Sequence, residues 1–243
     1  MNLTIDIGNT AVKWATFEGH ALTASGEWRM ADAAPFGGAE KVGRAMACAS
    51  GDAAMLDAVR RELGSPLMVL DADTPLPIEL DYKTPRTLGP DRVAAACGAW
   101  ALHAGDDCLV VDAGTCITVD FLSADGVYHG GAIMPGLRMG LQALHSGTAR
   151  LPLVSLEGVE RAPVLGRSTE ECILAGTLGA TMLALAGYVA LYRQRCPHLR
   201  VLLTGGDADL LATGGAEGWE RQPQLTHIGL NEILTYNDNE KTR

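Results

Sequence analysis

The sequence predicts an α/β fold in which one structural unit occurs twice. Strand-like and helix-like segments alternate along the 243 residues, as they do in α/β domains. An apolar strand that ends in an Asp-Gly turn also occurs twice, at Asp6-Ile7-Gly8-Asn9-Thr10 and at Asp112-Ala113-Gly114-Thr115. We therefore expect two halves, residues 1–105 and 106–243, in a chain long enough for one large or two smaller domains.

Each half begins with a predicted meander of three strands. These strands cover residues 3–7, 12–17 and 21–30 in the first half and residues 109–113, 117–121 and 127–133 in the second. Turn residues separate them. Predicted helices cover residues 39–49, 53–63 and 91–103, and a strand at 67–70 and a proline-punctuated loop at 73–90 lie between the last two. A third strand-to-turn signal, at residues 201–207, ends in Gly205-Gly206-Asp207.

Charge and cysteine usage exclude several classes of protein. The formal net charge is −10 and the pI is near 5.0, whereas a general nucleic-acid binder needs a basic surface. An anionic ligand must therefore be bound locally, by backbone N–H groups, helix ends, a metal or a few cations. The six cysteines form no CxxC pair, which favours reduced thiols. The first residues lack the regions of a signal peptide, so we expect a cytoplasmic protein.

An uncharged stretch at residues 172–192 is long enough to span a membrane. It contains several glycines and threonines, and residues 168–171 (Ser-Thr-Glu-Glu) form a capping box ahead of it. We therefore expect a buried helix and no membrane span. Gly176, Ala180 and Ala184 share one face of that helix, which permits close helix contact within the core or across a dimer.

The strand ends have the residues of a phosphate site. Glycine after a strand allows a sharp turn and leaves backbone N–H groups open to a phosphate. Asp6 can hold Mg²⁺, which bridges phosphate oxygens, and Lys13 can meet a phosphate as a point charge. Asp and Gly also fill tight hairpins for purely local reasons. The P-loop and Rossmann signatures are absent, so the nucleotide site indicated here is of another kind.

Motifs spread over most of the chain resemble those of the type III pantothenate kinases. They are Asp6-Ile7-Gly8-Asn9-Thr10, Gly89-Pro90-Asp91-Arg92, Asp112-Ala113-Gly114-Thr115 with Thr118 and Asp120, and Gly130-Gly131 with Ile133 and Pro135-Gly136. That family belongs to the superfamily of acetate and sugar kinases, heat-shock chaperones and actin. The resemblance implies a duplicated ribonuclease H-like (actin-like ATPase) fold, with two mixed sheets flanked by helices. It also implies ATP-dependent phosphorylation of pantothenate to 4'-phosphopantothenate, the first step of coenzyme A biosynthesis.

The resemblance also implies roles for individual residues. Asp91 is the expected general base, which accepts or orients the proton of the attacking hydroxyl. Asp6, Ile7, Gly8, Asn9, Thr10, Ala11, Val12, Lys13 and Thr115 are expected to bind ATP, with Asp6 organising Mg²⁺. Tyr82, Gly89, Pro90, Asp91, Arg92 and Thr169 are expected to bind pantothenate. Asp112 is the expected ligand of a monovalent cation, K⁺ or NH₄⁺, and two subunits are expected to share the site in a homodimer.

Other interpretations stay open at this level. Asp91 follows a proline at a predicted helix start, where the helix dipole alone favours an acid. Arg92 could be a solvated helix residue, Tyr82 a packed aromatic and Thr169 a helix cap. Two other functions are compatible with the sequence: a nucleotide-dependent transcriptional accessory regulator, and a superfamily kinase for another hydroxylated acid or sugar.

Overall fold

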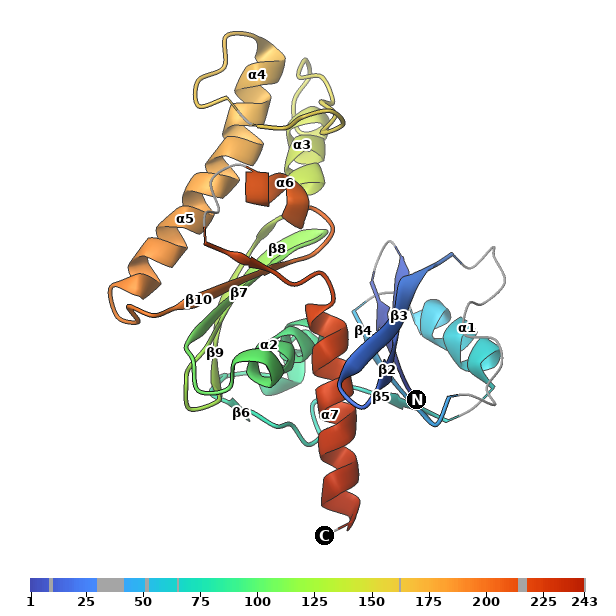
Figure 1. The fold of residues 1–243 in the computed structure, drawn as a ribbon. Coiled ribbons are helices and arrows are strands. Elements are labelled where there is room, and N and C mark those ends of the chain that lie inside the picture. The colour runs from blue at the N-terminus through green and yellow to red at the C-terminus, as the bar shows by residue number, and fades with distance from the viewer. Residues whose placement is uncertain are drawn as a thin grey trace. The chain divides into compact units, whose positions relative to one another are not determined.

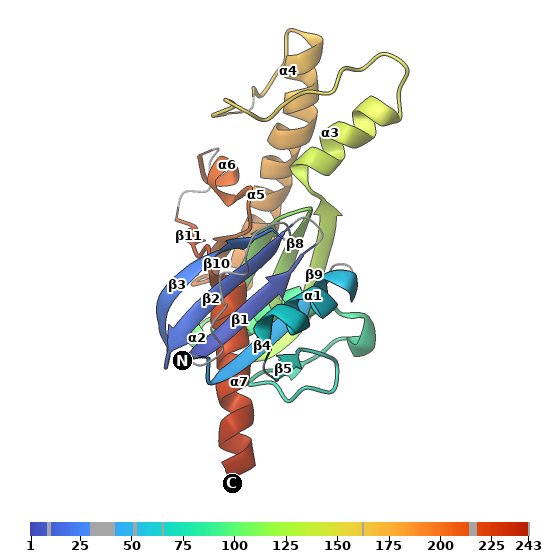
Figure 2. The same ribbon diagram turned by 90° about the vertical axis from the view of Figure 1, so that its right-hand side faces the viewer.

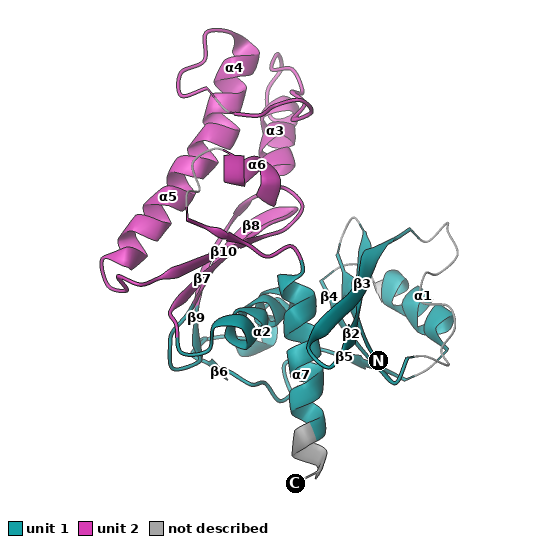
Figure 3. Ribbon diagram, in the orientation of Figure 1, with its two compact units in different colours: residues 1–105, 122–129, 224–243 teal, residues 106–121, 130–223 magenta. Residues whose placement is uncertain are grey.

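The computed structural model describes residues 1–8, 11–29, 42–50, 53–64, 66–161, 163–213 and 218–242 (Figure 1). The chain forms two compact units (Figure 3). The first unit contains Met1–Gly105, Leu122–His129 and Gln224–Arg243, and the second contains Asp106–Phe121 and Gly130–Pro223. Gly105 thus ends one segment of the first unit, and the C-terminal segment also belongs to that unit. The division into duplicated halves at residue 105 stays a prediction.

The first unit is built on a mixed five-stranded sheet with the order β3-β2-β1-β4-β5 (Figure 2). Its strands are β1 (Asn2–Ile7), β2 (Val12–Glu18), β3 (Ala21–Trp28), β4 (Arg44–Ala49) and β5 (Leu67–Val69). β1 pairs antiparallel with β2 and parallel with β4. Helix α1 (Ala53–Leu63) buries Val59 and Leu63 in one core with Leu3 and Ile5 of β1. The three predicted opening strands are thereby confirmed over their described residues.

The predicted helix at residues 39–49 is wrong where the structure describes it, because residues 44–49 form strand β4. Alanine favours helices, and this segment alternates alanine with other small or apolar residues. Its burial overrides that preference: Ala45, Met46 and Ala47 are almost inaccessible to solvent, between β1 and β5. Tertiary pairing, which single-segment propensity does not contain, decides the outcome.

Two helices of the first unit cross at very short range. They are α2 (Pro90–His103) and α7 (Leu225–Thr242). A Cβ atom added to Gly98 of α2 would lie 2.2 Å from the Leu225 carbonyl oxygen, and one added to Gly229 of α7 would lie 1.7 Å from the Ala94 carbonyl oxygen. Glycine at both positions therefore lets the two backbones approach. The crossing fixes α2, whose first turn carries Asp91.

The Gly229→Ala substitution is expected to destabilise the protein by about 3 kcal/mol, because overpacking against a backbone group costs about 1–3 kcal/mol or more. The added methyl group has to push α7 away from α2. Urea unfolding followed by circular dichroism measures the loss. The Gly98→Ala substitution alone should destabilise the protein by a similar amount. The double variant should lose less stability than the sum of the two single losses, because one displacement of α7 relieves both clashes. An unchanged unfolding midpoint for Gly229→Ala would contradict this account.

The second unit repeats the topology of the first. Its strands are β7 (Cys108–Ala113), β8 (Cys116–Leu122), β9 (Val127–Pro135), β10 (Arg200–Thr204) and β11 (Glu220–Arg221). They have the order β11-β10-β7-β8-β9 within a six-stranded sheet whose remaining edge strand, beside β9, is β6 (Glu79–Leu80). This order matches β5-β4-β1-β2-β3 strand for strand. Asp6 and Asp112 occupy the fifth position of β1 and β7, and both six-residue strands bury their residues in the same pattern. The predicted repeat is therefore present in the folded chain.

Helices complete both units. In the first unit a short 3-10 helix, η2 (Pro85–Thr87), precedes α2. Before it in the chain lies the short strand β6 (Glu79–Leu80), which pairs with Val127 and Tyr128 of β9. The second unit carries α3 (Leu137–Ser146), α4 (Thr169–Leu174), a π-helical turn η3 (Ala175–Gly179), α5 (Ala180–Arg193) and α6 (Ala208–Thr213). Its core joins Leu109 and Val111 of β7 to Leu178, Leu185 and Val189. The α/β class with two mixed sheets flanked by helices is confirmed.

Candidate functional site

A row of three side chains crosses the carboxyl end of β1. Asp6 pairs with Lys13 of β2 on one side and with Cys48 of β4 on the other. Residues that face each other in a ladder point to the same face of the sheet, so the carboxylate lies between an ammonium group and a thiol. The Cys48 thiol donates to Asp6 Oδ1 at 3.3 Å. Asp6 itself is half-buried.

The charge of Asp6 is set by its surroundings. Burial raises the pKa of its carboxyl group above the ordinary value, the Cys48 thiol and Lys13 lower it, and the nearby Asp91 carboxylate raises it. Burial also raises the pKa of the Cys48 thiol well above its usual range, which keeps the thiol protonated at neutral pH. The first unit therefore brings two of the predicted carboxylates, Asp6 and Asp91, into electrostatic contact with one lysine nearby.

The turn after β1 begins with Gly8. Its N–H donates to the Ala11 carbonyl oxygen at 3.1 Å, and the Ser50 N–H donates to the Ile7 carbonyl oxygen at 3.1 Å. Val12, the first residue of β2, is buried. Two of the predicted ATP-binding residues, Asn9 and Thr10, lie outside the described residues. The remaining members of residues 6–13 thus lie on β1, on β2 or at the two ends of the turn between them.

Asp91 lies in the first turn of α2. Gly89 is the N-cap residue and Pro90 occupies the first helical position, where its missing N–H costs nothing. The Arg92 N–H donates to Asp91 Oδ1 at 2.9 Å and to the Gly89 carbonyl oxygen at 3.1 Å. The Arg92 side chain is buried, at 7% exposure, so the solvated-residue interpretation of Arg92 is wrong.

Gly89 has no room for a side chain beside the Asp91 carboxylate. A Cβ atom at this position would lie 2.5 Å from Asp91 Oδ1. The Gly89→Ala substitution is therefore expected to turn the carboxylate and to lower kcat by about 100-fold, the effect of a displacement of about 1 Å at a reacting group. Steady-state kinetics on a variant with an unchanged melting temperature checks this. Retained kcat would show that the orientation of Asp91 does not matter.

Tyr82 follows β6 in the first unit. It is half-buried, and its ring packs against the buried Tyr128 with centroids 6.0 Å apart and planes tilted by 50°. The neighbouring Asp81 is held by His129, whose Nδ1 lies 3.1 Å from Asp81 Oδ2. The packed-aromatic interpretation of Tyr82 therefore describes a real contact, and its role toward a substrate stays a prediction.

A buried histidine near Lys13 was not expected from the sequence. His227 of α7 is 3% exposed, and its Nδ1 lies 2.9 Å from the Thr4 hydroxyl. Burial, with a smaller contribution from the charge of Lys13, lowers the pKa of His227 to about 4. The imidazole is therefore neutral at pH 7 and adds no second positive charge beside Lys13. No local pattern identifies it, because Thr4 and His227 are 223 residues apart.

The corresponding turn of the second unit follows β7. The Gly114 N–H donates to the Cys116 carbonyl oxygen at 3.0 Å, and the turn is two residues shorter than the turn after β1, because β8 begins at Cys116. Asp112 is half-buried and faces Thr204 in the ladder with β10, and Thr115 is exposed. A Cβ atom at Gly136 would lie 2.2 Å from the Thr115 carbonyl oxygen. The predicted Asp112 and Thr115 therefore lie at one tightly packed strand end.

An ion pair between Arg138 and Asp207 borders this strand end and was not predicted. Arg138 is in the first turn of α3, and the buried Asp207 precedes α6. The Asp207 N–H donates to the Ala113 carbonyl oxygen at 2.9 Å, and Gly205, with φ +93°, packs against the Ala113 backbone. The third strand-to-turn signal thus ends beside the turn after β7.

Thr169 is an exposed residue at the first position of α4. The helix is capped by its neighbour: Ser168 Oγ accepts from the Glu171 N–H at 3.2 Å, and a Glu171 carboxylate oxygen accepts from the Arg167 N–H at 2.6 Å. The Ser168 half of the predicted capping box is confirmed, whereas Glu171 bonds the N–H of Arg167 and not that of the N-cap residue Ser168. The capping interpretation of Thr169 is wrong, because Ser168 supplies the cap.

The donor groups fit a magnesium ion that is bound mainly through phosphates. In the described part of the chain, no three His, Cys, Asp or Glu side chains gather to hold a metal. Mg²⁺ is commonly bound by one or two carboxylates together with substrate phosphates and water. The hard carboxylate oxygens of Asp6 suit that role. The neighbouring Lys13 can place its positive charge beside a phosphate.

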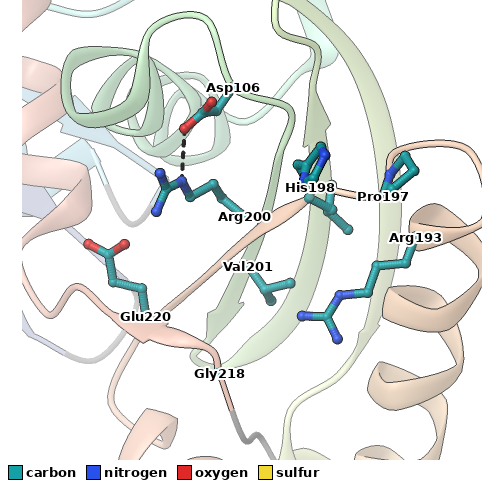
Figure 4. Close-up of a pocket in the computed structure, with 9 residues that line it drawn as sticks. Asp106, Arg193, Pro197, His198, Arg200, Val201, Gly218 and Glu220 are labelled. Carbon is teal, nitrogen blue, oxygen red and sulfur yellow. Dashed lines mark hydrogen bonds and ion pairs between the residues drawn. The ribbon is translucent and has the colours of Figure 1, made fainter.

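A separate pocket of about 460 Å³ lies at the other end of the second sheet (Figure 4). Asp106, Arg193, His198, Arg200 and Glu220 are among its lining residues. It is at the start of β10, whereas Thr204 beside Asp112 is at its end. Arg200 donates to Asp106 at 2.8 Å, so acids offset part of its positive charge. None of the predicted site residues lines this pocket.

Comparison with known proteins gives a consistent family. The family model of type III pantothenate kinase matches residues 40–191. A type III pantothenate kinase from Phocaeicola vulgatus is 40% identical over 243 residues, which cover 98% of this chain and 99% of the relative. One from Cytophaga hutchinsonii is 37% identical over 238 residues, which cover 98% and 100%.

Solved structures show the same fold. A protein from Campylobacter jejuni, assigned to the Baf family of transcriptional activators, has a TM-score of 0.63 at 21% identity over 98% of this chain and 99% of its own. Component A of the (R)-2-hydroxyglutaryl-CoA dehydratase of Acidaminococcus fermentans has a TM-score of 0.51 at 14% identity over 100% and 99%. These structures show the fold alone, and the family model together with the relatives shows that the chain belongs to the type III pantothenate kinase family.

Proposed function

We propose that this chain transfers the γ-phosphoryl group of ATP to the terminal hydroxyl of pantothenate and so begins coenzyme A biosynthesis. The observation that carries the proposal is the nearness of the Asp6 and Asp91 carboxylates, which is sufficient for Asp91 to raise the pKa of Asp6, in the first unit of a chain of this family. Phosphoryl transfer asks a protein mainly to align the reactants and to stabilise charge. One carboxylate near a phosphate turn and one at a helix start provide the two groups that such an alignment needs.

The two carboxylates have different roles. Asp6 and Lys13, beside the turn that begins at Gly8, bind the ATP phosphates together with the other predicted residues that lie between them in the sequence. When bound, Mg²⁺ neutralises phosphate charge. Asp91 orients the attacking hydroxyl: Oδ1 is held by the Arg92 N–H, which leaves Oδ2 to accept the proton. In the second unit, Thr115 contacts the nucleotide.

Pantothenate is assigned to the residues around the start of α2. Gly89, Pro90 and Arg92 surround Asp91 in the chain, and Tyr82 presents a half-buried ring in the loop before them. Thr169 is free to contact a substrate through its hydroxyl, because Ser168 rather than Thr169 caps α4. Asp112 is assigned to a monovalent cation, K⁺ or NH₄⁺, because its carboxylate at the end of β7 is a hard oxygen donor.

ADP release by the purified protein tests substrate and cation together. The assay contains ATP, Mg²⁺ and pantothenate in matched buffers with potassium or with sodium only. Turnover that depends on both pantothenate and potassium is expected. An equal rate in both buffers would contradict the role of Asp112 in cation binding and would leave the assignment as a kinase unchanged. Binding of ATP without any pantothenate-dependent turnover would contradict the proposed substrate and favour another hydroxylated acid or sugar as acceptor.

Two further assignments accompany the kinase proposal. We place the enzyme in the reducing cytoplasm, where thiols persist, and all six cysteines are free. A transcriptional regulator is not favoured, because the curated relatives named here are called kinases over nearly their full length. The net charge of −10 also opposes direct contact with DNA.

We also propose a homodimer, formed through the exposed face of the helical stretch Thr169–Arg193. By length and composition this stretch could cross a membrane, which is weak support for a span. One face is buried in the second unit through Leu178, Leu185 and Val189, so the expected burial holds for that face only. On the other face Leu183 is 74% exposed and Leu191 61%.

The exposed face has the composition of a helix interface. Gly176, Ala180, Leu183, Gly187 and Leu191 recur at spacings of three and four residues. Cβ atoms added to Gly176 or Gly187 would meet nothing within 4 Å. Small residues allow a second helix to approach closely, and large exposed apolar residues on one face are typical of protein interfaces. A second copy of the chain fits such a face better than lipid does, because the opposite face is packed in a core.

The Leu183→Glu substitution is expected to convert the dimer into a monomer and to abolish pantothenate phosphorylation if the site is shared. A buried, unpaired carboxylate in the interface costs several kcal/mol. Sedimentation velocity measures the state of association. Leu22→Glu, on exposed strand β3, is the control and should stay dimeric. A monomeric Leu183→Glu variant with full activity would refute the shared site, and a wild-type monomer would refute the dimer.

A further inference from the structure

Cys48 contacts the phosphate-binding region although the proposed reaction assigns it no role. Its side chain has no solvent exposure, and it faces Asp6 in the parallel ladder between β4 and β1. Its thiol reaches Asp6 Oδ1 at 3.3 Å, which is within the range for a sulfur donor. Among the described residues, Cys48 is the only side chain that donates a hydrogen bond to this carboxylate.

We propose that Cys48 is a positioning residue that fixes the carboxylate of Asp6 for binding of the Mg²⁺–ATP complex. The proposal rests on the proposed function in one respect, that Asp6 serves the nucleotide. The thiol holds Oδ1 from the β4 side of the row, which leaves Oδ2 directed away from β4. Cys48 thereby acts through Asp6 and does not touch the nucleotide.

The opposite neighbour explains why such a donor is needed. Lys13 lies on the other side of Asp6 in the same row, and an ammonium group can draw a carboxylate into a closed ion pair. A carboxylate captured in this way would offer fewer oxygen lone pairs to Mg²⁺. A thiol on the β4 side opposes that movement and adds no charge of its own. A basic residue at position 48 would compete with the metal instead, and an acidic one would repel Asp6.

The second unit has a related arrangement. Asp112 faces Thr204 of β10 in the parallel ladder, and β10 corresponds to β4 in the repeated strand order. Thr204 is also buried, at 3% exposure. In both units a small, neutral residue with one S–H or O–H group therefore occupies the ladder position beside the strand-end aspartate. This repetition favours a positional requirement over chance packing of a cysteine.

Nucleotide affinity tests the proposal without depending on the acceptor. Calorimetry measures binding of ATP with Mg²⁺ to wild type, Cys48→Ala, Cys48→Ser and Cys97→Ala in the absence of pantothenate. Cys48→Ala should bind about 10-fold more weakly, as when a partner that orients a metal-binding carboxylate is lost. Cys48→Ser should recover most of that loss, because its hydroxyl can donate. Cys97→Ala, which removes another fully buried thiol of the first unit, should bind like wild type.

An infrared readout separates positioning from packing. The S–H stretching band of Cys48, identified by its loss in Cys48→Ala, should lie at lower frequency than the band lost in Cys97→Ala, because donation to a carboxylate weakens the S–H bond. Wild-type affinity of Cys48→Ala, or equal weakening in Cys97→Ala and Cys48→Ala, would overturn the proposal. So would a Cys48→Ser variant as weak as Cys48→Ala. If the wild-type protein binds ATP but does not phosphorylate pantothenate, the proposed substrate is contradicted and the role of Cys48 in nucleotide binding is not.

Discussion

The Asp91→Asn substitution is expected to lower kcat by about 10²–10⁴-fold, which is the usual contribution of a positioned general base. Asparagine has the shape of aspartate, and its Oδ1 can still accept from the Arg92 N–H, which donates to Asp91 at 2.9 Å. The first turn of α2 should therefore stay in place. The second oxygen becomes an NH₂ group, which donates a hydrogen bond and cannot accept the proton of the attacking hydroxyl.

Binding and stability distinguish this effect from unfolding. The affinity for ATP with Mg²⁺ should change little, since Asp6 and Lys13 are intact, and the melting temperature should stay near that of wild type. Asp57→Asn, on an exposed residue of α1, is a matched control and should keep full activity. If Asp91→Asn retains substantial turnover, Asp91 is an ordinary helix-start acid, as the helix dipole alone would favour.

The repeated fold and the position of the strand-end aspartates were predictable from the sequence. Asp6 and Asp112 each follow a run of apolar residues and precede a glycine, and this local pattern is sufficient to place a strand end and a turn. The start of α2 was predictable for the same reason, because Pro90 favours the first helical position. These features depend on a few neighbouring residues.

The features that the sequence did not reveal depend on distant residues. The Cys48 thiol meets Asp6 from 42 positions away, and His227 meets Thr4 from 223 positions away. Strand β4 was predicted as a helix because its alanines favour helices locally, whereas its burial between β1 and β5 exists only in the folded sheet. Pairing and burial of this kind have no short-range signature.

The Asp6→Asn substitution is expected to remove function and to stabilise the fold. Loss of the carboxylate should lower kcat/KM for ATP with Mg²⁺ by at least about 100-fold, comparable to removing a preorganised charged or polar group from an active site. Asparagine can still accept from the Cys48 thiol, so the sheet should remain intact. Retained affinity for ATP with Mg²⁺ would show that Asp6 does not serve the nucleotide.

The stabilisation has a defined dependence on pH. Burial raises the pKa of the Asp6 carboxyl group in the folded protein above its ordinary value of 3.8, so the folded state binds the proton more tightly than the unfolded state does. The free energy of unfolding of the wild type therefore decreases as the pH rises from the pKa of Asp6 in the unfolded state to its pKa in the folded state, and the decrease is complete above the folded-state pKa. The Asp6→Asn variant does not show this decrease, because asparagine does not titrate. Urea unfolding should show a larger advantage of Asp6→Asn at pH 8 than at pH 4, and a variant less stable than wild type at pH 8 would mean that Lys13 and Cys48 outweigh burial.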